Sequence, residues 1–248
     1  GVIDVPIYTT LAASSVNYIL NDSEPRVFFL ENKEMFDRVE DFLDECKSLE
    51  TLVFFDIKGI DHPKAISLDD LELRGTELRN SQPDLLGKLI DSIRPTEIAT
   101  LIYTSGTTGE PKGVMLTHNN IISNVIDAGE KYDFGQDDIP LSVLPLSHIF
   151  ERSAMYLYIY NGMSVHYAES IEKVPDNLRE VRPTIFVGVP RIFEKVYAKA
   201  KLQAATAGGM KEEMFEWAIE TAKEHAAHKE CGSPVSTFLS IKHWLADR

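Results

Sequence analysis

The feature that most constrains the fold is an alternation of short β-branched or aromatic runs with helical patterns along most of the chain. The predicted strands are residues 5–9, 26–30, 51–56, 99–105, 113–118, 141–145, 163–168 and 184–189. The predicted helices are residues 12–21, 31–48, 119–132, 151–160, 175–181, 191–200, 210–230 and 235–245. This alternation is typical of a layered α/β fold with largely parallel sheets and flanking helices.

The rhythm of the pattern divides the 248 residues into four subregions. Residues 1–56 form an α/β subregion, and residues 98–200 resume the alternation. Residues 57–97, rich in Gly, Pro and charge, predict a surface excursion with short helices at 67–73 and 83–91. Residues 201–248 predict a helical segment. The N-terminal GVIDVPIYTT resembles a buried strand and lacks the basic start of a signal peptide, so we expect a piece of a longer protein.

Composition narrows the classes of partner. The chain has 25 Lys and Arg against 39 Asp and Glu, a net charge of −14, which argues against a nucleic-acid groove. No stretch approaches the roughly 18 uninterrupted apolar residues that a membrane span needs. Cys46 and Cys231 lie far apart without metal-like spacing, so two reduced thiols are expected, consistent with a cytoplasmic protein.

The most chemically specific stretch is YTSGTTGEPKGVMLTH, residues 103–118. Glycines free backbone N–H groups to converge on anionic oxygens, and Ser, Thr and Lys add donors and charge, so a phosphate is the indicated ligand. The Walker pattern fails, because Pro111 stands where a glycine is required and Gly113 follows Lys112. The flanks predict strand, loop, strand. A connecting hairpin without a ligand is the alternative.

This stretch resembles the phosphate-binding signature of the adenylate-forming, or AMP-binding, superfamily, which includes acyl-CoA synthetases, luciferases and peptide-synthetase adenylation domains. The resemblance implies a loop that holds the β- and γ-phosphates of ATP and releases pyrophosphate. The nucleotide-binding residues that it implies are Thr104, Ser105, Gly106, Thr107, Thr108, Gly109, Lys112 and Gly113. Thr104 is also the candidate contact for Mg²⁺.

Two further stretches, residues 144–167 and 178–200, resemble the long-chain fatty acyl-CoA synthetase branch of that superfamily. The resemblance implies that His148 is the catalytic residue beside the substrate carboxylate, with Ile149 and Arg152 on the same wall of the substrate site. Independently, His148 follows a predicted strand at a Pro-containing turn, a position where α/β proteins place sites; a structural histidine is the alternative. A fatty acid is already ionised at pH 7, so His148 would position it rather than deprotonate it.

The implied reaction has two steps: a fatty acid and ATP give acyl-AMP and pyrophosphate, and CoA then displaces AMP. The implied cofactors and partners are ATP, Mg²⁺, CoA and the fatty acid, without nucleic acid; peripheral contact with a membrane stays open. Residues 201–248 contain neither the glutamate-bearing segment nor the late lysine of the family. We therefore expect residues 1–248 to be a partial N-terminal AMP-binding domain without the C-terminal lid domain, inactive alone. The alternatives are a ligase for an aryl or medium-chain acid and a non-catalytic nucleotide-binding fragment.

Overall fold

The computed structural model describes residues 1–104, 111–230 and 234–246. The chain divides into two compact units, of which the first comprises Gly1–His166 with Pro183–Ile185. The second comprises Tyr167–Arg182 with Phe186–Arg248. None of the described helices is both long enough and apolar enough to cross a membrane.

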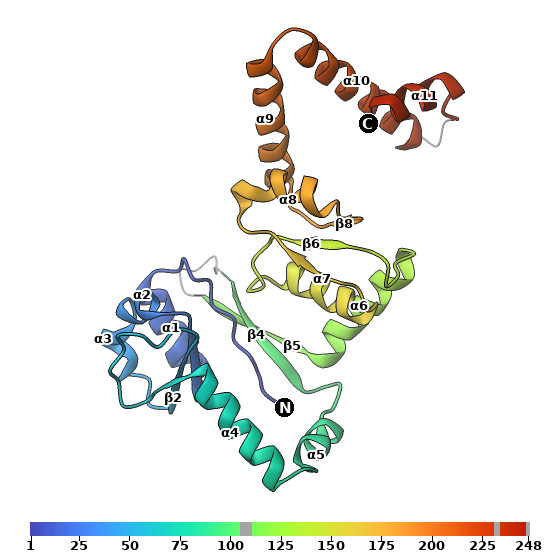
Figure 1. Ribbon diagram of the computed structural model, residues 1–248. Helices are drawn as coiled ribbons and strands as arrows, with labels where there is room; N and C mark the ends of the chain where they lie inside the picture. The colour runs from blue at the N-terminus through green and yellow to red at the C-terminus, as the bar shows by residue number, and fades with distance from the viewer. Residues whose placement is uncertain (105–110, 231–233, 247–248) are drawn as a thin grey trace. The chain divides into compact units, whose positions relative to one another are not determined.

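The first sheet of unit 1 is parallel, with the strand order β1-β2-β3. Its strands are β1 (Val27–Leu30), β2 (Thr51–Phe54) and β3 (Ala65–Ser67), with Val27 opposite Thr51 and Leu52 opposite Ala65. Helices α1 (Ala13–Ser23), α2 (Lys33–Asp37) and α3 (Glu40–Leu43) accompany it (Figure 1). Helices α2 and α3 form the crossover between β1 and β2 that a parallel pair needs, and α1 precedes β1.

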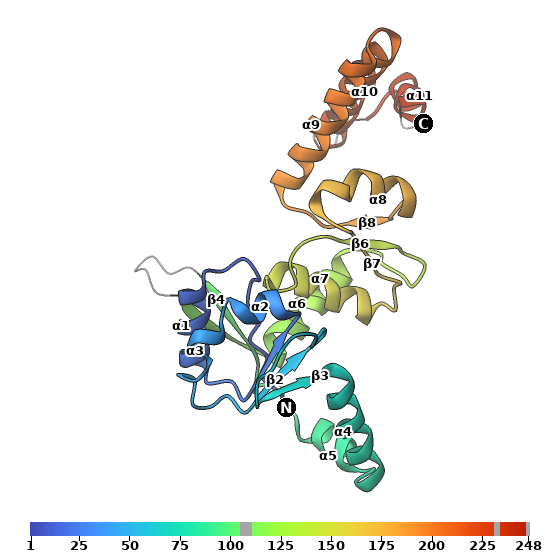
Figure 2. The ribbon, with the colours of Figure 1, turned by 60° about the vertical axis from the view of Figure 1, so that its left-hand side comes forward.

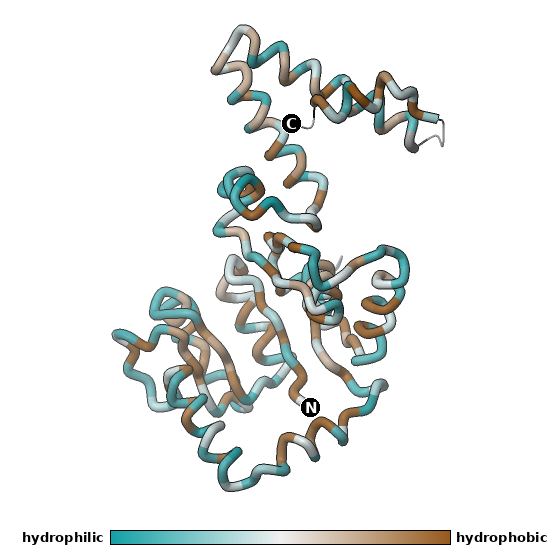
Figure 3. Tube along the Cα trace, turned by 45° about the vertical axis from the view of Figure 1, so that its right-hand side comes forward, coloured by the Kyte–Doolittle hydropathy of each residue, from teal (hydrophilic) through white to brown (hydrophobic). Residues whose placement is uncertain are grey.

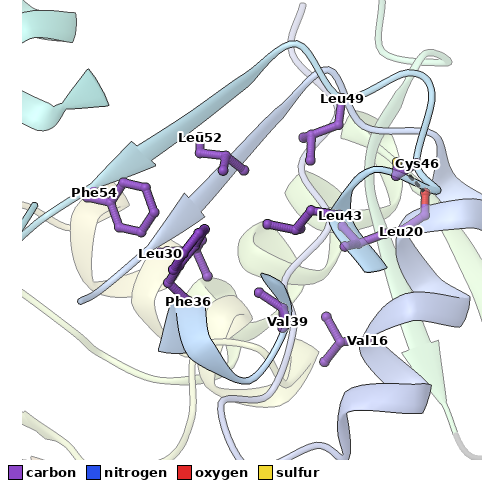
Figure 4. Close-up of a cluster of buried hydrophobic side chains, with 10 residues drawn as sticks. All are labelled: Val16, Leu20, Leu30, Phe36, Val39, Leu43, Cys46, Leu49, Leu52 and Phe54. Atoms are coloured by element: carbon purple, nitrogen blue, oxygen red, sulfur yellow. Dashed lines mark hydrogen bonds between the residues drawn. The ribbon is translucent and has the colours of Figure 1, made fainter. Parts of the chain in front are cut away.

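A cluster of apolar side chains fills the space between this sheet and its helices (Figure 4). In β2, Leu52, Val53 and Phe54 are completely buried, which explains why this strand is apolar without alternation. The rings of Phe36 and Phe54 meet edge to face with centroids 5.7 Å apart. Each such side chain contributes about 1.5–3 kcal/mol by leaving water. Figure 3 shows the strands of this parallel sheet as mostly brown, hydrophobic segments.

The single helix predicted over residues 31–48 is wrong, because the chain breaks into α2 and α3 around Arg38 and Val39. Arg38 donates hydrogen bonds of 2.6 Å to the carbonyl oxygens of Thr9 and Leu11. Val39 leaves helical geometry and is buried in the apolar cluster. Tertiary contacts therefore override the local helical pattern.

The surface excursion predicted for residues 57–97 contains a strand that the sequence reading missed. Strand β3 pairs with β2 and leads directly into α4 (Leu68–Ser81), as Figure 2 shows. Ser67 caps α4, since its hydroxyl accepts from the Asp70 N–H while the Asp70 carboxylate accepts from the Ser67 N–H. The helix extends past Gly75 to Ser81 and is followed by α5 (Leu85–Ser92).

An antiparallel hairpin forms the second sheet, from β4 (Ile98–Thr104) and β5 (Lys112–Thr117). The two predicted strands are confirmed, and residues 105–110 between them lie outside the described residues. The two strands are antiparallel, whereas the sequence predicted largely parallel sheets. Helix α6 (His118–Lys131) follows at once, capped by Thr117 with Asn120 reaching back to its N–H.

The strand predicted at residues 5–9 is not formed. Instead Asp4 makes a parallel bridge to Thr100 on the free side of β4, through Asp4 N–H to Ala99 O at 3.3 Å and Leu101 N–H to Asp4 O at 3.0 Å. Pro6 lacks the N–H that would continue this pairing. The trace beside the N-terminal marker is hydrophobic in Figure 3, and Val2 and Ile3 are exposed.

The remaining predicted strands are shorter than expected. A third sheet has the order β7-β6-β8, with β6 (Pro140–Ser142), β7 (His166–Tyr167) and β8 (Ile185–Phe186). Strand β6 is fully buried, and the loop after it leads into α7 (Ile149–Tyr160). The helices of unit 2 are η1 (Ile171–Lys173), α8 (Val174–Val181), α9 (Pro190–Ala207), α10 (Met210–Glu230) and α11 (Thr237–Ala246).

Candidate active site

The end of the β4–β5 hairpin places two of the predicted phosphate ligands opposite each other. Thr104 and Lys112 are the last residue pair of the ladder, and both are exposed. The chain between them carries Ser105, Gly106, Thr107, Thr108 and Gly109, which lie outside the described residues. The hairpin therefore presents one hydroxyl and one ammonium group where this loop leaves the sheet and returns.

Gly113 has a structural role that the sequence did not reveal. A Cβ added at Gly113 would lie 3.1 Å from Cζ and 3.3 Å from Oη of Tyr103, the residue opposite it in the ladder. The Tyr103 ring occupies that space, and its hydroxyl donates a 2.5 Å hydrogen bond to Oδ2 of Asp22 in α1. Burial and the Asp22 carboxylate raise the pKa of the Tyr103 phenol. The hairpin end is thus tied to α1 by a contact that needs Gly113 to be small.

His148 is the N-cap of α7, at the end of the loop after β6. The ring nitrogen Nδ1 accepts a 3.2 Å hydrogen bond from the backbone N–H of Phe150. The backbone N–H of His148 donates to the Pro145 carbonyl oxygen at 2.9 Å. Because Nδ1 is engaged with the Phe150 N–H, Nε2 is the ring nitrogen that this exposed side chain can offer to a ligand.

Arg152 lies one turn further along α7 and is nearly buried. Nη1 donates to Asp4 Oδ2 at 2.8 Å and to Thr100 Oγ1 at 2.9 Å. Nη2 donates to Asp4 Oδ1 at 3.1 Å and to Tyr156 Oη at 3.0 Å. The structure thus brings together helix α7, strand β4 and the N-terminal segment at one guanidinium group.

A cavity of about 630 Å³ opens beside this network in unit 1. The N-terminal segment 6–10, the turn 145–147 and the first two turns of α7 line it, with Asp4 and Arg152 at its wall. Apolar residues and hydroxyl-bearing residues both line it: the former are Pro6, Ile7, Pro145, Leu146 and Met155, and the latter are Tyr8, Thr9, Thr10, Ser147 and Tyr156. A mixed wall of this kind suits a ligand with an apolar body and a polar end. His148 and Ile149 directly follow the turn that lines the cavity.

Glu151 is a buried carboxyl group that the sequence analysis did not predict, although it lies within residues 144–167. Its side chain is fully buried, and Ser142 of β6 donates a 2.5 Å hydrogen bond to Oε1. Burial raises the pKa of Glu151, against smaller opposing effects of the hydrogen bonds from Ser142 and the Val143 backbone. Burial and the neighbouring Glu151 also raise the pKa of Tyr158 to about 12. The Ser142–Glu151 hydrogen bond joins β6 to α7 inside the core.

Comparison with known protein families shows to which family the chain belongs. Residues 1–246 match the model of the AMP-binding enzyme family. The chain belongs to the AMP-binding enzyme family. The predicted membership in the adenylate-forming, or AMP-binding, superfamily is thus confirmed. The α/β fold class is confirmed by the structure, with its parallel sheet and flanking helices.

Curated members of the AMP-binding family align with nearly the whole chain. The peroxisomal long chain acyl-CoA synthetase 6 of Arabidopsis thaliana is 32% identical over 99% of the chain and 36% of its own length. The long-chain-fatty-acid–CoA ligase FadD15 of Mycobacterium tuberculosis is 33% identical over 100% of the chain and 40% of its own length. The chain thus spans well under half the length of these relatives, and they are long-chain ligases by name.

Solved structures of AMP-binding enzymes share the fold. The inhibitor-bound N-terminal domain of FACL13 from Mycobacterium tuberculosis superposes with a TM-score of 0.60 at 25% identity, covering 78% of this chain and 45% of that one. VinN in complex with 3-methylaspartate gives a TM-score of 0.60 at 22% identity, covering 80% and 48%. The latter likeness shows the fold alone.

Proposed function

We propose that the protein carrying this chain is a long-chain fatty acid–CoA ligase that forms AMP. The observation that carries the proposal is the match of an AMP-binding family model across residues 1–246, together with long-chain ligases among relatives 32–34% identical over most of the chain. The hairpin that sets Thr104 opposite Lys112 supports it, because pyrophosphate release needs donors held at the base of a loop.

In the proposed first step a carboxylate oxygen of the fatty acid attacks the α-phosphorus of ATP. The bond from the α-phosphorus to the bridging oxygen breaks, and pyrophosphate leaves with that electron pair. Lys112 would neutralise charge on the leaving group, and Thr104 with Ser105, Thr107 and Thr108 would donate hydrogen bonds to it. Gly106, Gly109 and Gly113 would let the backbone approach the phosphates.

His148 would lie beside the carboxylate and donate from Nε2–H, orienting the attacking group, with Ile149 on the same wall. Arg152 belongs to this wall too, at the edge of the 630 Å³ cavity. In the second step the thiolate of CoA attacks the acyl carbon, and AMP leaves. The mixture of apolar and hydroxyl-bearing residues that lines the cavity would suit the carboxyl end of an acyl chain.

Mg²⁺ would supply charge neutralisation at the phosphates. The described residues hold no group of three or more His, Cys, Asp or Glu side chains that could bind a metal ion by itself. Mg²⁺ usually takes few protein ligands and keeps water and substrate phosphates as the rest. The exposed Thr104 hydroxyl fits the role of one such ligand.

We further propose that residues 1–248 are part of an N-terminal AMP-binding domain, completed in the whole protein by the rest of that domain and a C-terminal lid. The test uses the protein expressed from its complete reading frame. Acid-dependent formation of acyl-AMP from ATP is measured with hexanoate, decanoate, palmitate and benzoate. Preference for palmitate supports the proposal. Preference for benzoate favours the aryl alternative, preference for hexanoate or decanoate favours the medium-chain alternative, and ATP binding without turnover favours the non-catalytic one.

A cytoplasmic location with peripheral membrane contact also stays a proposal. Long-chain acids partition into bilayers, which would favour an enzyme that works at their surface. Co-sedimentation of the complete protein with phosphatidylcholine vesicles, with and without palmitate, tests this contact.

A further inference from the structure

Four of the five N–H donors of the Arg152 side chain, those on Nη1 and Nη2, are already used within the protein. Each Nη nitrogen carries two hydrogens, and each makes two hydrogen bonds of 2.8–3.1 Å. Their acceptors are both carboxylate oxygens of Asp4, the Thr100 hydroxyl and the Tyr156 hydroxyl. The Nη groups therefore have no hydrogen left for a substrate carboxylate or phosphate.

The Thr100 hydroxyl both donates and accepts a hydrogen bond in this network. The Thr100 hydroxyl donates its own hydrogen to the Asp4 carbonyl at 3.0 Å, so its lone pairs are free to accept from Arg152. Thr100 is completely buried, and the Arg152 side chain is 11% exposed. An arginine fork is geometrically demanding, and a lysine cannot make the same set of bonds.

The three elements joined here carry the proposed chemistry. The backbone N–H of Arg152 donates to the His148 carbonyl at 3.2 Å and so closes the first turn of α7. Thr100 stands on β4 four residues before Thr104, a distance of about 13 Å along a strand. Asp4 forms a parallel bridge with Thr100 along the edge of β4 that does not pair with β5.

We propose that Arg152 is a positioning residue, which sets the His148 turn against the strand that leads to the phosphate loop, and does not touch substrate. This inference rests on the proposed function. It assigns Arg152 a different task from the substrate contact that the family resemblance implies. A misplacement of reacting groups by about 1 Å can cost about a hundredfold in rate, so such a residue affects turnover more than binding.

The test compares Arg152→Lys, Thr100→Val and their double variant in the complete protein. The control is Arg26→Lys, because Arg26 makes a comparable two-pronged contact with Glu50, both bonds 2.8 Å long, but is exposed and outside the network. For Arg152→Lys we expect kcat of acyl-AMP formation to fall about 10- to 100-fold, with the KM values of palmitate and ATP within about threefold. The double variant should be no slower than Arg152→Lys, since both changes break one network.

Two results would overturn the inference. A KM for palmitate that rises tenfold or more in Arg152→Lys at unchanged kcat would mean that Arg152 contacts substrate. Kinetics of Arg152→Lys equal to those of Arg26→Lys would mean that the network does not position anything.

A readout independent of activity separates this inference from the proposed function. Leu101 N–H donates to Asp4 O, so loosening Asp4 should speed hydrogen exchange at Leu101 about tenfold in Arg152→Lys but not in Arg26→Lys. If the wild-type protein adenylates no acid, the proposed function fails, and faster exchange at Leu101 in Arg152→Lys still supports the positioning role of Arg152. Unchanged exchange at Leu101 overturns the positioning role whatever the activity.

Discussion

Gly113→Ala tests whether the hairpin end is built around the Tyr103 ring. The new methyl group would stand 3.1–3.4 Å from two ring carbons and the hydroxyl oxygen of Tyr103, so the tyrosine side chain would have to shift by a few tenths of an ångström. Overpacking of this kind costs about 1–3 kcal/mol, and displacing the hydroxyl from Asp22 costs about 1 kcal/mol more. Alanine recovers about 0.5–1 kcal/mol over glycine in a strand, because Gly113 has no positive φ that alanine would strain.

The net expectation is a loss of about 2 kcal/mol in the free energy of unfolding. In a Tyr103→Ala background the same Gly113→Ala change should cost nothing or stabilise slightly, since the atoms that it would meet are gone. Urea-induced unfolding of the four proteins of this cycle, followed by circular dichroism, gives the coupling energy. An equal cost of Gly113→Ala in both backgrounds would refute the steric argument and leave glycine's role at this position to the nucleotide.

Two further predictions concern the core and the extent of the chain. The raised pKa of Glu151 means that the folded state holds a proton which the unfolded state loses near pH 4.3, so this group's contribution to stability is present at low pH and is lost as the pH rises through the folded pKa. Glu151→Gln should therefore gain stability relative to wild type in thermal unfolding as the pH rises above the unfolded pKa of glutamate, and a pH-independent difference would contradict the raised pKa. Residues 1–248 alone should form no acyl-CoA from palmitate, ATP and CoA; thioester above a heat-killed control would show that the proposed missing groups are not needed.

The sequence predicted those parts of the fold that depend on local pattern. The apolar run at Leu52–Phe54 indicates a buried parallel strand, and the glycine–hydroxyl stretch between two β-forming runs indicates the hairpin. Strand β3 was missed because three residues among glycines, prolines and charges carry no period. Its existence depends on pairing with β2, which local sequence does not encode.

The contacts of the candidate site were less accessible to sequence reasoning. Thr104, Lys112 and His148 stand out by residue type and neighbours, and the structure places each at the end of an element. The network joins Arg152 to Asp4, which is 148 residues away along the chain, and to Thr100, which is 52 residues away. The Tyr103–Asp22 hydrogen bond spans 81 residues. Nothing in a single sequence marks Asp4 or Asp22 as partners, because such contacts follow from tertiary packing alone.

The central claim is that the hairpin end holds the pyrophosphate that leaves in the first step, and Lys112→Ala tests it most directly. Acyl-AMP formation and CoA transfer from pre-formed acyl-AMP are measured separately in the complete protein, with the exposed Lys88→Ala in α5 as the control. Loss of a charge-assisted contact worth about 1.5–3 kcal/mol should slow acyl-AMP formation about 10- to 100-fold. CoA transfer should stay within about twofold of wild type, because pyrophosphate has already left. Equal losses in both half-reactions, with a parallel fall in melting temperature, would contradict the account and leave residues 103–118 as a structural hairpin.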